Sequence, residues 1–222
     1  MNYSGSIEPV VVIDFETSGM SPEQGDRAIE VGAVLIREGE IADRFQSLIN
    51  PGFLITQEIK MVTGINNQML AAAPTAQSVM SDLARFIGTA PLVAHNASFD
   101  QKFLEAELTL IGKNRLYNFG CTLLLAKRLY PEMPNHKLET LVRLKGLATN
   151  GQFHRALADA EMTAALWLKI VADLQHQYGF TALPFEILKK LGKIPYQQVD
   201  EFLQKSAAEL KVEPPDTTGS LF

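Results

Sequence analysis

The chain has 222 residues, 46% of them hydrophobic, a formal net charge of −5 at pH 7 and a single cysteine. This length suits one domain with an extension, and the charge argues against a protein that coats long nucleic acid by neutralising phosphates. Cys121 cannot form an intramolecular disulfide, and no apolar run approaches the roughly 20 residues of a membrane helix. Residues 1–9 lack the pattern of a signal peptide, so we expect a cytoplasmic protein without membrane association.

Strands open the chain. Residues 10–13 form a β-branched apolar run, which predicts a buried strand that ends in the segment 14–19. Apolar runs at 28–36 and 44–49 predict two further strands, and Gly39 between charged residues predicts the turn that joins them. The chain therefore begins as a sheet rich in hairpins.

Helices alternate with a short strand in the middle of the chain. Apolar spacing predicts a helix over residues 75–87 that stops at Gly88, followed by a buried strand at 92–94. A second helix should follow that strand, with an apolar face made of Phe99, Phe103, Ala106 and Leu110. We expect further helices at 122–129, at 138–144 and from about 156 to 174.

The character of the chain changes after Tyr178. Residues 185–191 and 199–210 predict two short amphipathic helices, and residues 212–222 predict a flexible tail. Because strands come first and then mix with helices, the sequence predicts an α/β architecture, in which a central sheet carries helices on its faces.

Two acidic residues follow the first predicted strand directly. Asp14 and Glu16 are two positions apart, so their side chains share one face of the strand. Adjacent carboxylates repel each other unless a cation lies between them, and hard oxygen ligands suit Mg²⁺ or Mn²⁺. Other acid-x-acid pairs occur at Glu38/Glu40, Glu105/Glu107 and Asp159/Glu161. The buried strand that precedes Asp14 is what distinguishes the first pair.

Three later residues complete the candidate set. Asp100 falls in the first turn of a predicted helix, where an acid also interacts favourably with the helix dipole. His154 and Asp159 are five positions apart, which on one helix would point them ~140° apart. They can converge only if His154 lies in the loop before the helix and Asp159 lies in its early turns.

Three segments together resemble a known family. Asp-Phe-Glu-Thr-Ser-Gly at 14–19, His-Asn-Ala-Ser-Phe-Asp at 95–100 and His-Arg-Ala-Leu-Ala-Asp-Ala at 154–160 are similar, in order, to the motifs of DEDDh 3′–5′ exonucleases. The residues of these motifs are most similar to the branch of the epsilon proofreading subunit of bacterial DNA polymerase III. Residues 62–65 and 121–131 extend the resemblance between the motifs. It covers about residues 8–175, which leaves 176–211 as a helical C-terminal extension and 212–222 as the tail.

The resemblance implies a ribonuclease-H-like exonuclease fold and a set of roles. Asp14, Glu16, Asp100 and Asp159 would hold two divalent metal ions, Mg²⁺ or Mn²⁺, and His154 would be the general base. For recognition of the 3′-terminal nucleotide, we expect backbone amides near Thr17 to hold the 3′ hydroxyl, and side chains beside the motifs to contact the substrate. Those side chains are Met20, His95, Asn96 and Phe99.

Three functions stay open from the sequence alone. The first is removal of nucleotides from the 3′ end of DNA, with single-stranded DNA favoured over RNA, in proofreading or DNA repair. The second is trimming of RNA 3′ ends, as in ribonuclease T or oligoribonuclease. The third is a non-catalytic module associated with a polymerase or clamp, against which the presence of all the family's catalytic residues argues. The Leu221-Phe222 ending is also similar to peptides that bind the bacterial sliding clamp.

Overall fold

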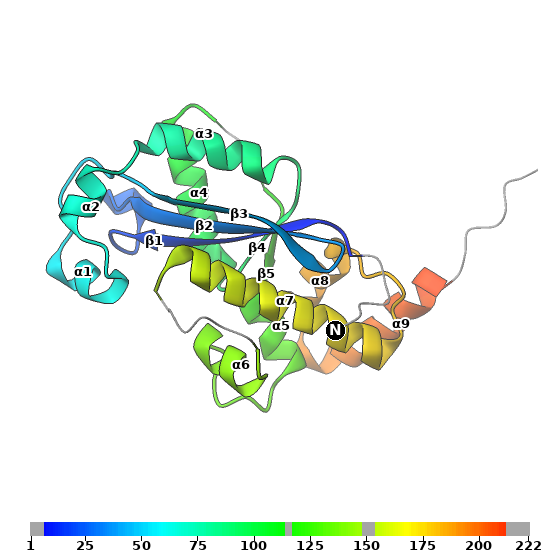
Figure 1. The fold of residues 1–222 in the computed structure, drawn as a ribbon. Helices are drawn as coiled ribbons and strands as arrows, with labels where there is room; N and C mark the ends of the chain where they lie inside the picture. The colour runs from blue at the N-terminus through cyan, green and yellow to red at the C-terminus, as the bar shows by residue number, and fades with distance from the viewer. Residues whose placement is uncertain (1–6, 114–116, 148–153, 212–222) are drawn as a thin grey trace, which may run out of the picture.

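A five-stranded mixed sheet forms the centre of the computed structural model, which describes residues 7–113, 117–147 and 154–211. The strands are β1 (Val10–Thr17), β2 (Ala28–Arg37), β3 (Glu40–Leu48), β4 (Leu92–Ala94) and β5 (Phe119–Cys121), in the order β3-β2-β1-β4-β5. β1, β2 and β3 pair antiparallel, whereas β4 and β5 run parallel to β1. The predicted α/β sheet is thus confirmed (Figure 1).

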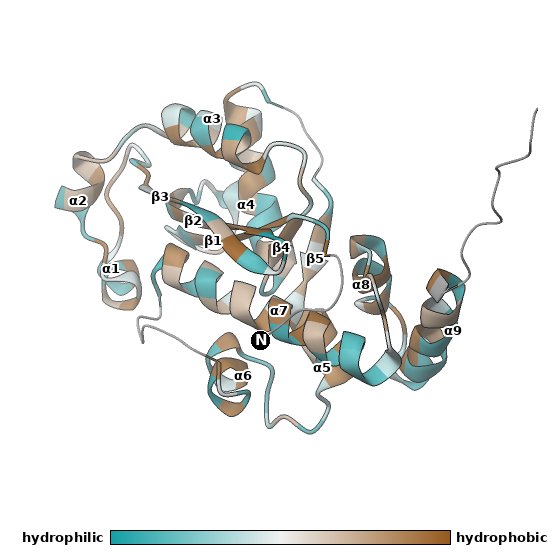
Figure 2. Cartoon of the chain, turned by 45° about the vertical axis from the view of Figure 1, so that its right-hand side comes forward, coloured by the Kyte–Doolittle hydropathy of each residue, from teal (hydrophilic) through white to brown (hydrophobic). Residues whose placement is uncertain are grey.

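Strict alternation along β1 separates two cores. Val11 and Ile13 pack into one cluster with α3 (Ala76–Ile87) and α4 (Ala97–Leu110), while Val10 and Val12 pack into the other with α7 (Ala156–Tyr178). The sheet is therefore covered on both faces, and Figure 1 shows α7 lying along it on the side opposite α3. In Figure 2 the helices around the sheet carry both brown and teal residues, as helices between a core and solvent do.

The C-terminal helices join the same core as α7. α5 (Thr122–Leu129), α8 (Phe185–Leu191) and α9 (Val199–Lys211) contribute buried side chains to the cluster that holds Trp167. α7 continues to Tyr178 and ends at Gly179 in a left-handed conformation, so the boundary expected at residue 175 lies inside this helix. The division into a domain and an extension stays a prediction, and residues 212–222 lie outside the described residues.

The structure adds elements that the apolar pattern does not predict. α1 (Gln57–Thr63) and α2 (Asn67–Ala71) are short helices capped by Thr56 and Asn66, and they cover a small cluster around Ile29. Both lie at the end of the sheet where β1 finishes, as does the start of α7 (Figure 1). The short helix α6 (Leu138–Leu144) and the helices at 185–191 and 199–210 match the predicted positions.

The prediction of the apolar face of α4 is wrong, because the buried face is shifted from the predicted one by about one residue. Phe103 is buried, but Leu110 is 64% exposed, and the helix turns Asp100 and Glu107 toward the protein instead. A count of apolar spacing misses this face because two of its buried members are acidic.

None of the helices within the described residues is long and apolar enough to cross a membrane.

Candidate active site

Three carboxylates from two elements converge at the end of β1. Asp14 and Glu16 continue the face of β1 that carries Val10 and Val12, and the first turn of α7 brings Asp159 to the same place. One ligand oxygen from each of the three lies within 4.8 Å of the others. Residues that are more than 140 positions apart in the sequence thus form one half-buried acidic cluster.

The electrostatics of this cluster are unfavourable for the protein alone. Burial, with repulsion from Asp100, Asp159 and Glu16, holds the pKa of Asp14 well above its usual range. Burial and then repulsion from Asp159 raise the pKa of Glu16 to about 7, and burial also raises the pKa of Asp159. Among the described residues, no lysine or arginine forms an ion pair with any of these three carboxylates.

The donor set fits a hard divalent cation. Three carboxylates supply only oxygen ligands, which Mg²⁺ and Mn²⁺ prefer over nitrogen or sulfur. A cation among them would favour their ionised forms, which oppose one another in its absence.

Asp100 lies directly behind the cluster. It is 2% exposed, and its Oδ1 accepts the backbone N–H of Phe15 at 3.1 Å. Burial raises its pKa to about 8, against the effect of that hydrogen bond. It acts electrostatically on Asp14, but it is not one of the three residues whose oxygens converge.

His154 lies immediately before α7, and Asp159 lies in the first turn of that helix, which is the placement that their spacing demands. His154 has a left-handed backbone conformation (φ 62°), and its backbone N–H donates to Asp159 Oδ2 at 2.9 Å. Its side chain is exposed. The backbone therefore places His154 beside Asp159 of the acidic cluster, with the residue exposed.

His95 and Asn96 form the corner between β4 and α4. His95 has a protein partner at each ring nitrogen, Thr122 Oγ1 at Nδ1 and the carbonyl oxygen of His136 at Nε2, both at 2.9 Å. Since a carbonyl can only accept, Nε2 carries the proton, and burial lowers the pKa of His95 to about 4. Asn96 is exposed, with φ 71°. Contact of either residue with substrate stays a prediction.

The remaining predicted contact residues surround the turn after β1. Thr17 is buried, and its hydroxyl donates to the carbonyl oxygen of Gly19 at 2.6 Å. Met20 is 71% exposed, so it does not pack in the core. The half-buried Phe99 stacks against Phe103 with ring centroids 5.0 Å apart, and Lys102 Nζ lies 5.2 Å from the Phe99 ring while also donating to the Met20 carbonyl oxygen.

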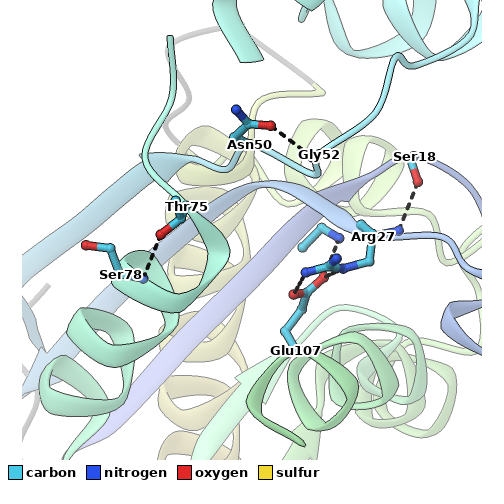
Figure 3. Close-up of polar contacts among 8 residues, drawn as sticks. Ser18, Arg27, Asn50, Gly52, Thr75, Ser78 and Glu107 are labelled. Atoms are coloured by element: carbon cyan, nitrogen blue, oxygen red, sulfur yellow. Dashed lines mark hydrogen bonds and ion pairs between the residues drawn. The ribbon is translucent and has the colours of Figure 1, made fainter. Parts of the chain in front are cut away.

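Two buried glutamates pair with partly exposed arginines in this region, and sequence reasoning did not single out these pairs. Arg27 donates from Nε and Nη2 to Glu107 of α4 at 2.8 and 2.7 Å, and Figure 3 also shows the backbone N–H of Arg27 donating to Ser18. Arg155 likewise donates to Glu30 on β2 at 3.2 and 2.9 Å. The one available signal was a lone acid, Glu30, inside the apolar run 28–36.

Comparisons with known proteins agree with this geometry. The family model described as Exonuclease (RNase_T) matches residues 11–167. The epsilon subunit of DNA polymerase III from Aquifex aeolicus is 35% identical over 184 residues, which are 82% of this chain and 89% of that subunit. A PolC-type DNA polymerase III from Bacillus subtilis is 40% identical over 171 residues, or 75% of this chain and only 12% of that polymerase.

Solved structures show the same fold. The structure of exonuclease X in complex with 5′ overhanging duplex DNA superposes with a TM-score of 0.66 and 26% identity, covering 82% of this chain and 99% of that one. The mixed sheet with helices on both faces is thus the ribonuclease-H-like fold of a nuclease. The chain belongs to the exonuclease family, and within it to the DEDDh 3′–5′ exonucleases near the epsilon subunits of bacterial DNA polymerase III.

Proposed function

We propose that this chain is a metal-dependent exonuclease that removes nucleotides from the 3′ end of DNA, in proofreading or DNA repair. The observation that carries the proposal is the convergence of Asp14, Glu16 and Asp159 within 4.8 Å of one another, without a lysine or arginine paired to them among the described residues. Such a site needs a cation to be stable in its ionised form. The similarity to epsilon subunits favours DNA as the substrate.

Each side chain of the cluster has a distinct part in this proposal. Asp14, Glu16 and Asp159 hold divalent cations through their oxygens, and Asp100 supports them from behind Asp14. Two such cations, when bound, would polarise the phosphodiester and make the attacking water more acidic. His154 takes a proton from that water, since an imidazole is the side chain that most often serves as a general base and this one lies on the loop that contacts Asp159.

The 3′-terminal nucleotide is held by the turn after β1 and the first turn of α4. The exposed Met20 side chain and the half-buried Phe99 ring offer apolar surfaces on which any base can stack. Lys102, which lies over the Phe99 ring, adds a positive charge for a phosphate. Recognition of this kind reads stacking and backbone rather than sequence, which suits an enzyme that removes any terminal nucleotide.

A degradation assay tests the proposal. The full chain is incubated with 5′-labelled single-stranded DNA and with RNA of the same sequence, in Mg²⁺, in Mn²⁺ and in EDTA. We expect a ladder that shortens from the 3′ end of the DNA, is lost in EDTA, and falls at least ~10³-fold in rate for Asp14→Ala, because metal and nucleophile are lost together. Glu40→Ala removes an exposed acid of a second acid-x-acid pair and should leave the rate unchanged.

Other results would redirect or end the proposal. Faster shortening of RNA than of DNA would favour the RNA-trimming function over proofreading. No degradation of either strand by folded protein in Mg²⁺ or Mn²⁺ would contradict the enzymatic role and favour the non-catalytic module. Equal rates for Asp14→Ala and the unsubstituted chain would show that another protein causes the degradation.

A further inference from the structure

Glu30 is a charged residue near the start of the buried strand β2, and its side chain accepts from four N–H groups of the protein. It is 0% exposed and accepts from Arg155 Nη2 at 2.9 Å, Arg155 Nε at 3.2 Å, the backbone N–H of Ala156 at 3.2 Å and Gln46 Nε2 at 2.9 Å. Both carboxylate oxygens are therefore engaged by N–H groups. Glu30 cannot also serve as a metal ligand without giving up this pairing.

These donors belong to the start of α7, the helix that carries Asp159. Arg155 is the N-cap residue of α7, and its side chain forms no hydrogen bond that caps the helix. Glu30 thus supplies the cap from another element, as a carboxylate at the N-terminal end of a helix does. The carbonyl oxygen of Arg155 accepts the Asp159 N–H at 3.0 Å, so fixing Arg155 fixes the turn that presents Asp159. His154, one residue earlier, is fixed at the same time.

The register of the sheet puts this anchor next to the acidic cluster. Glu16 on β1 is paired with Glu30 on β2, and Asp14 is paired with Gly32, two residues further along the same face. A side chain at Gly32 would overlap backbone atoms of Ala156 and Leu157, so the absence of one lets α7 approach the sheet. One strand therefore offers two carboxylates to the site, and its neighbour holds the helix that brings the third.

We propose that Glu30 is a positioning residue, which acts with Gly32 to clamp the first turn of α7 against β2 so that Asp159 and His154 are held at Asp14 and Glu16. This inference rests on the proposed function, because it assigns Glu30 to the construction of the metal site. Glu30 does not touch substrate or metal. It acts through Arg155, whose guanidinium binds Glu30 although Glu16 also interacts with it electrostatically.

The chain contains a matched control for the test. Glu107 is 2% exposed and accepts from Arg27 Nε, Arg27 Nη2 and the backbone N–H of Ala28. Apart from Gln46, the donors match those of Glu30: two N–H groups of an arginine and the backbone N–H of the residue that follows the arginine. Glu107, however, braces the start of β2 and does not contact the helix that carries Asp159.

The experiment compares Glu30→Gln with Glu107→Gln in the full chain. Mn²⁺ affinity is measured from the electron paramagnetic resonance signal of free Mn²⁺, with thermal unfolding and kcat and KM on single-stranded DNA as further readouts. We expect both variants to unfold at lower temperature. Only Glu30→Gln should lose Mn²⁺ affinity and kcat, by about 10- to 100-fold with KM little changed, as for residues that orient metal ligands.

Each outcome decides something. Loss of stability in Glu30→Gln with Mn²⁺ affinity within about twofold of Glu107→Gln would overturn the positioning role and leave a purely structural one. If Glu30→Gln does not fold, Arg155→Lys replaces it, because the Arg155 side chain is 37% exposed and lysine keeps the charge but not the two-donor geometry. An unsubstituted chain that neither binds Mn²⁺ nor degrades DNA would instead refute the proposed function itself, and the positioning role with it.

Discussion

Two groups of carboxylates in this protein have contrasting surroundings. Glu30 and Glu107 each bind an arginine through two N–H donors and accept the backbone N–H of the residue that follows it. Asp14, Glu16 and Asp159 instead face one another. Burial raises the pKa of each of these three, and neighbouring carboxylates add to the effect.

The contrast shows how one residue type serves two purposes. A glutamate whose oxygens are all engaged by N–H groups joins distant elements and has no capacity left for a ligand. A carboxylate that faces others of its kind costs the metal-free protein free energy but keeps its oxygens for a cation. Arg155 illustrates the division, since it pairs with Glu30 although Glu16 is also close enough to affect its pKa.

The largest effect on this contrast is expected from a substitution that displaces α7 from the sheet without changing any charge. In Gly32→Ala, the new methyl group would overlap backbone atoms of Ala156 and Leu157. Those atoms belong to α7, so they can move only if the helix is displaced. We expect a loss of about 3 kcal/mol in the free energy of unfolding and at least tenfold weaker Mn²⁺ binding. Urea unfolding and a Mn²⁺ titration measure the two effects.

Gly120→Ala is the control for that substitution. It lies on β5, away from the acidic cluster, and its new methyl group would meet Phe185 Cε2 at 3.1 Å, a side chain that can adjust. A cost of about 1 kcal/mol with unchanged Mn²⁺ affinity is expected. Equal Mn²⁺ affinity in Gly32→Ala and the unsubstituted chain would show that the close approach of α7 to β2 does not control the site.

A second prediction extends the contrast to His95, whose two ring nitrogens both have protein partners. Because its pKa is lowered from 6.5 to about 4, the folded state keeps it neutral while the unfolded chain takes up a proton. The stability that it contributes is fully present above pH 6.5 and is lost as the pH falls toward 4. At about 1.36 kcal/mol per pH unit, the loss is roughly 3 kcal/mol.

Urea unfolding at pH 7.5 and pH 5.0 measures about 2 kcal/mol of that loss, because pH 5.0 still lies above the pKa of about 4 in the folded state. His95→Gln, which does not titrate, should have a smaller difference in unfolding free energy between the two pH values than the unsubstituted chain. His176→Gln changes an exposed histidine and should reproduce the unsubstituted difference. If His95→Gln and His176→Gln respond to pH alike, His95 is not held neutral by its surroundings.

Much of this arrangement follows from local sequence rules. Alternation along a strand predicts that Asp14 and Glu16 share a face, and helical geometry predicts that His154 must precede the helix in which Asp159 lies. The structure has both features. The sheet and most of the helices could be predicted because their apolar residues repeat with the period of the element.

The rest depends on partners that are far away in the sequence. Glu30 and Arg155 are 125 residues apart, and nothing local to either residue indicates the other. The buried face of α4 could not be predicted from apolar spacing, since Asp100 and Glu107 are buried there through bonds to Phe15 and Arg27. α1 and α2 are too short for periodicity and depend on capping and on the cluster that they cover.

The smallest predicted effect tests whether Asp14 lowers the stability of the metal-free protein while Glu107 raises it. In EDTA at pH 8, Asp14→Asn replaces a carboxyl group whose ionised form is opposed by burial and by repulsion from neighbouring carboxylates, so the variant should unfold about 2–4 °C higher than the unsubstituted chain. Glu107→Gln should unfold lower, because it removes a charge that two N–H groups of Arg27 and the backbone N–H of Ala28 stabilise. Addition of Mn²⁺ should then raise the unfolding temperature of the unsubstituted chain and of Glu107→Gln, but not that of Asp14→Asn. Differential scanning calorimetry measures all three, and a lower unfolding temperature for metal-free Asp14→Asn would mean that Asp14 is held by protein partners in the same way as the paired glutamates.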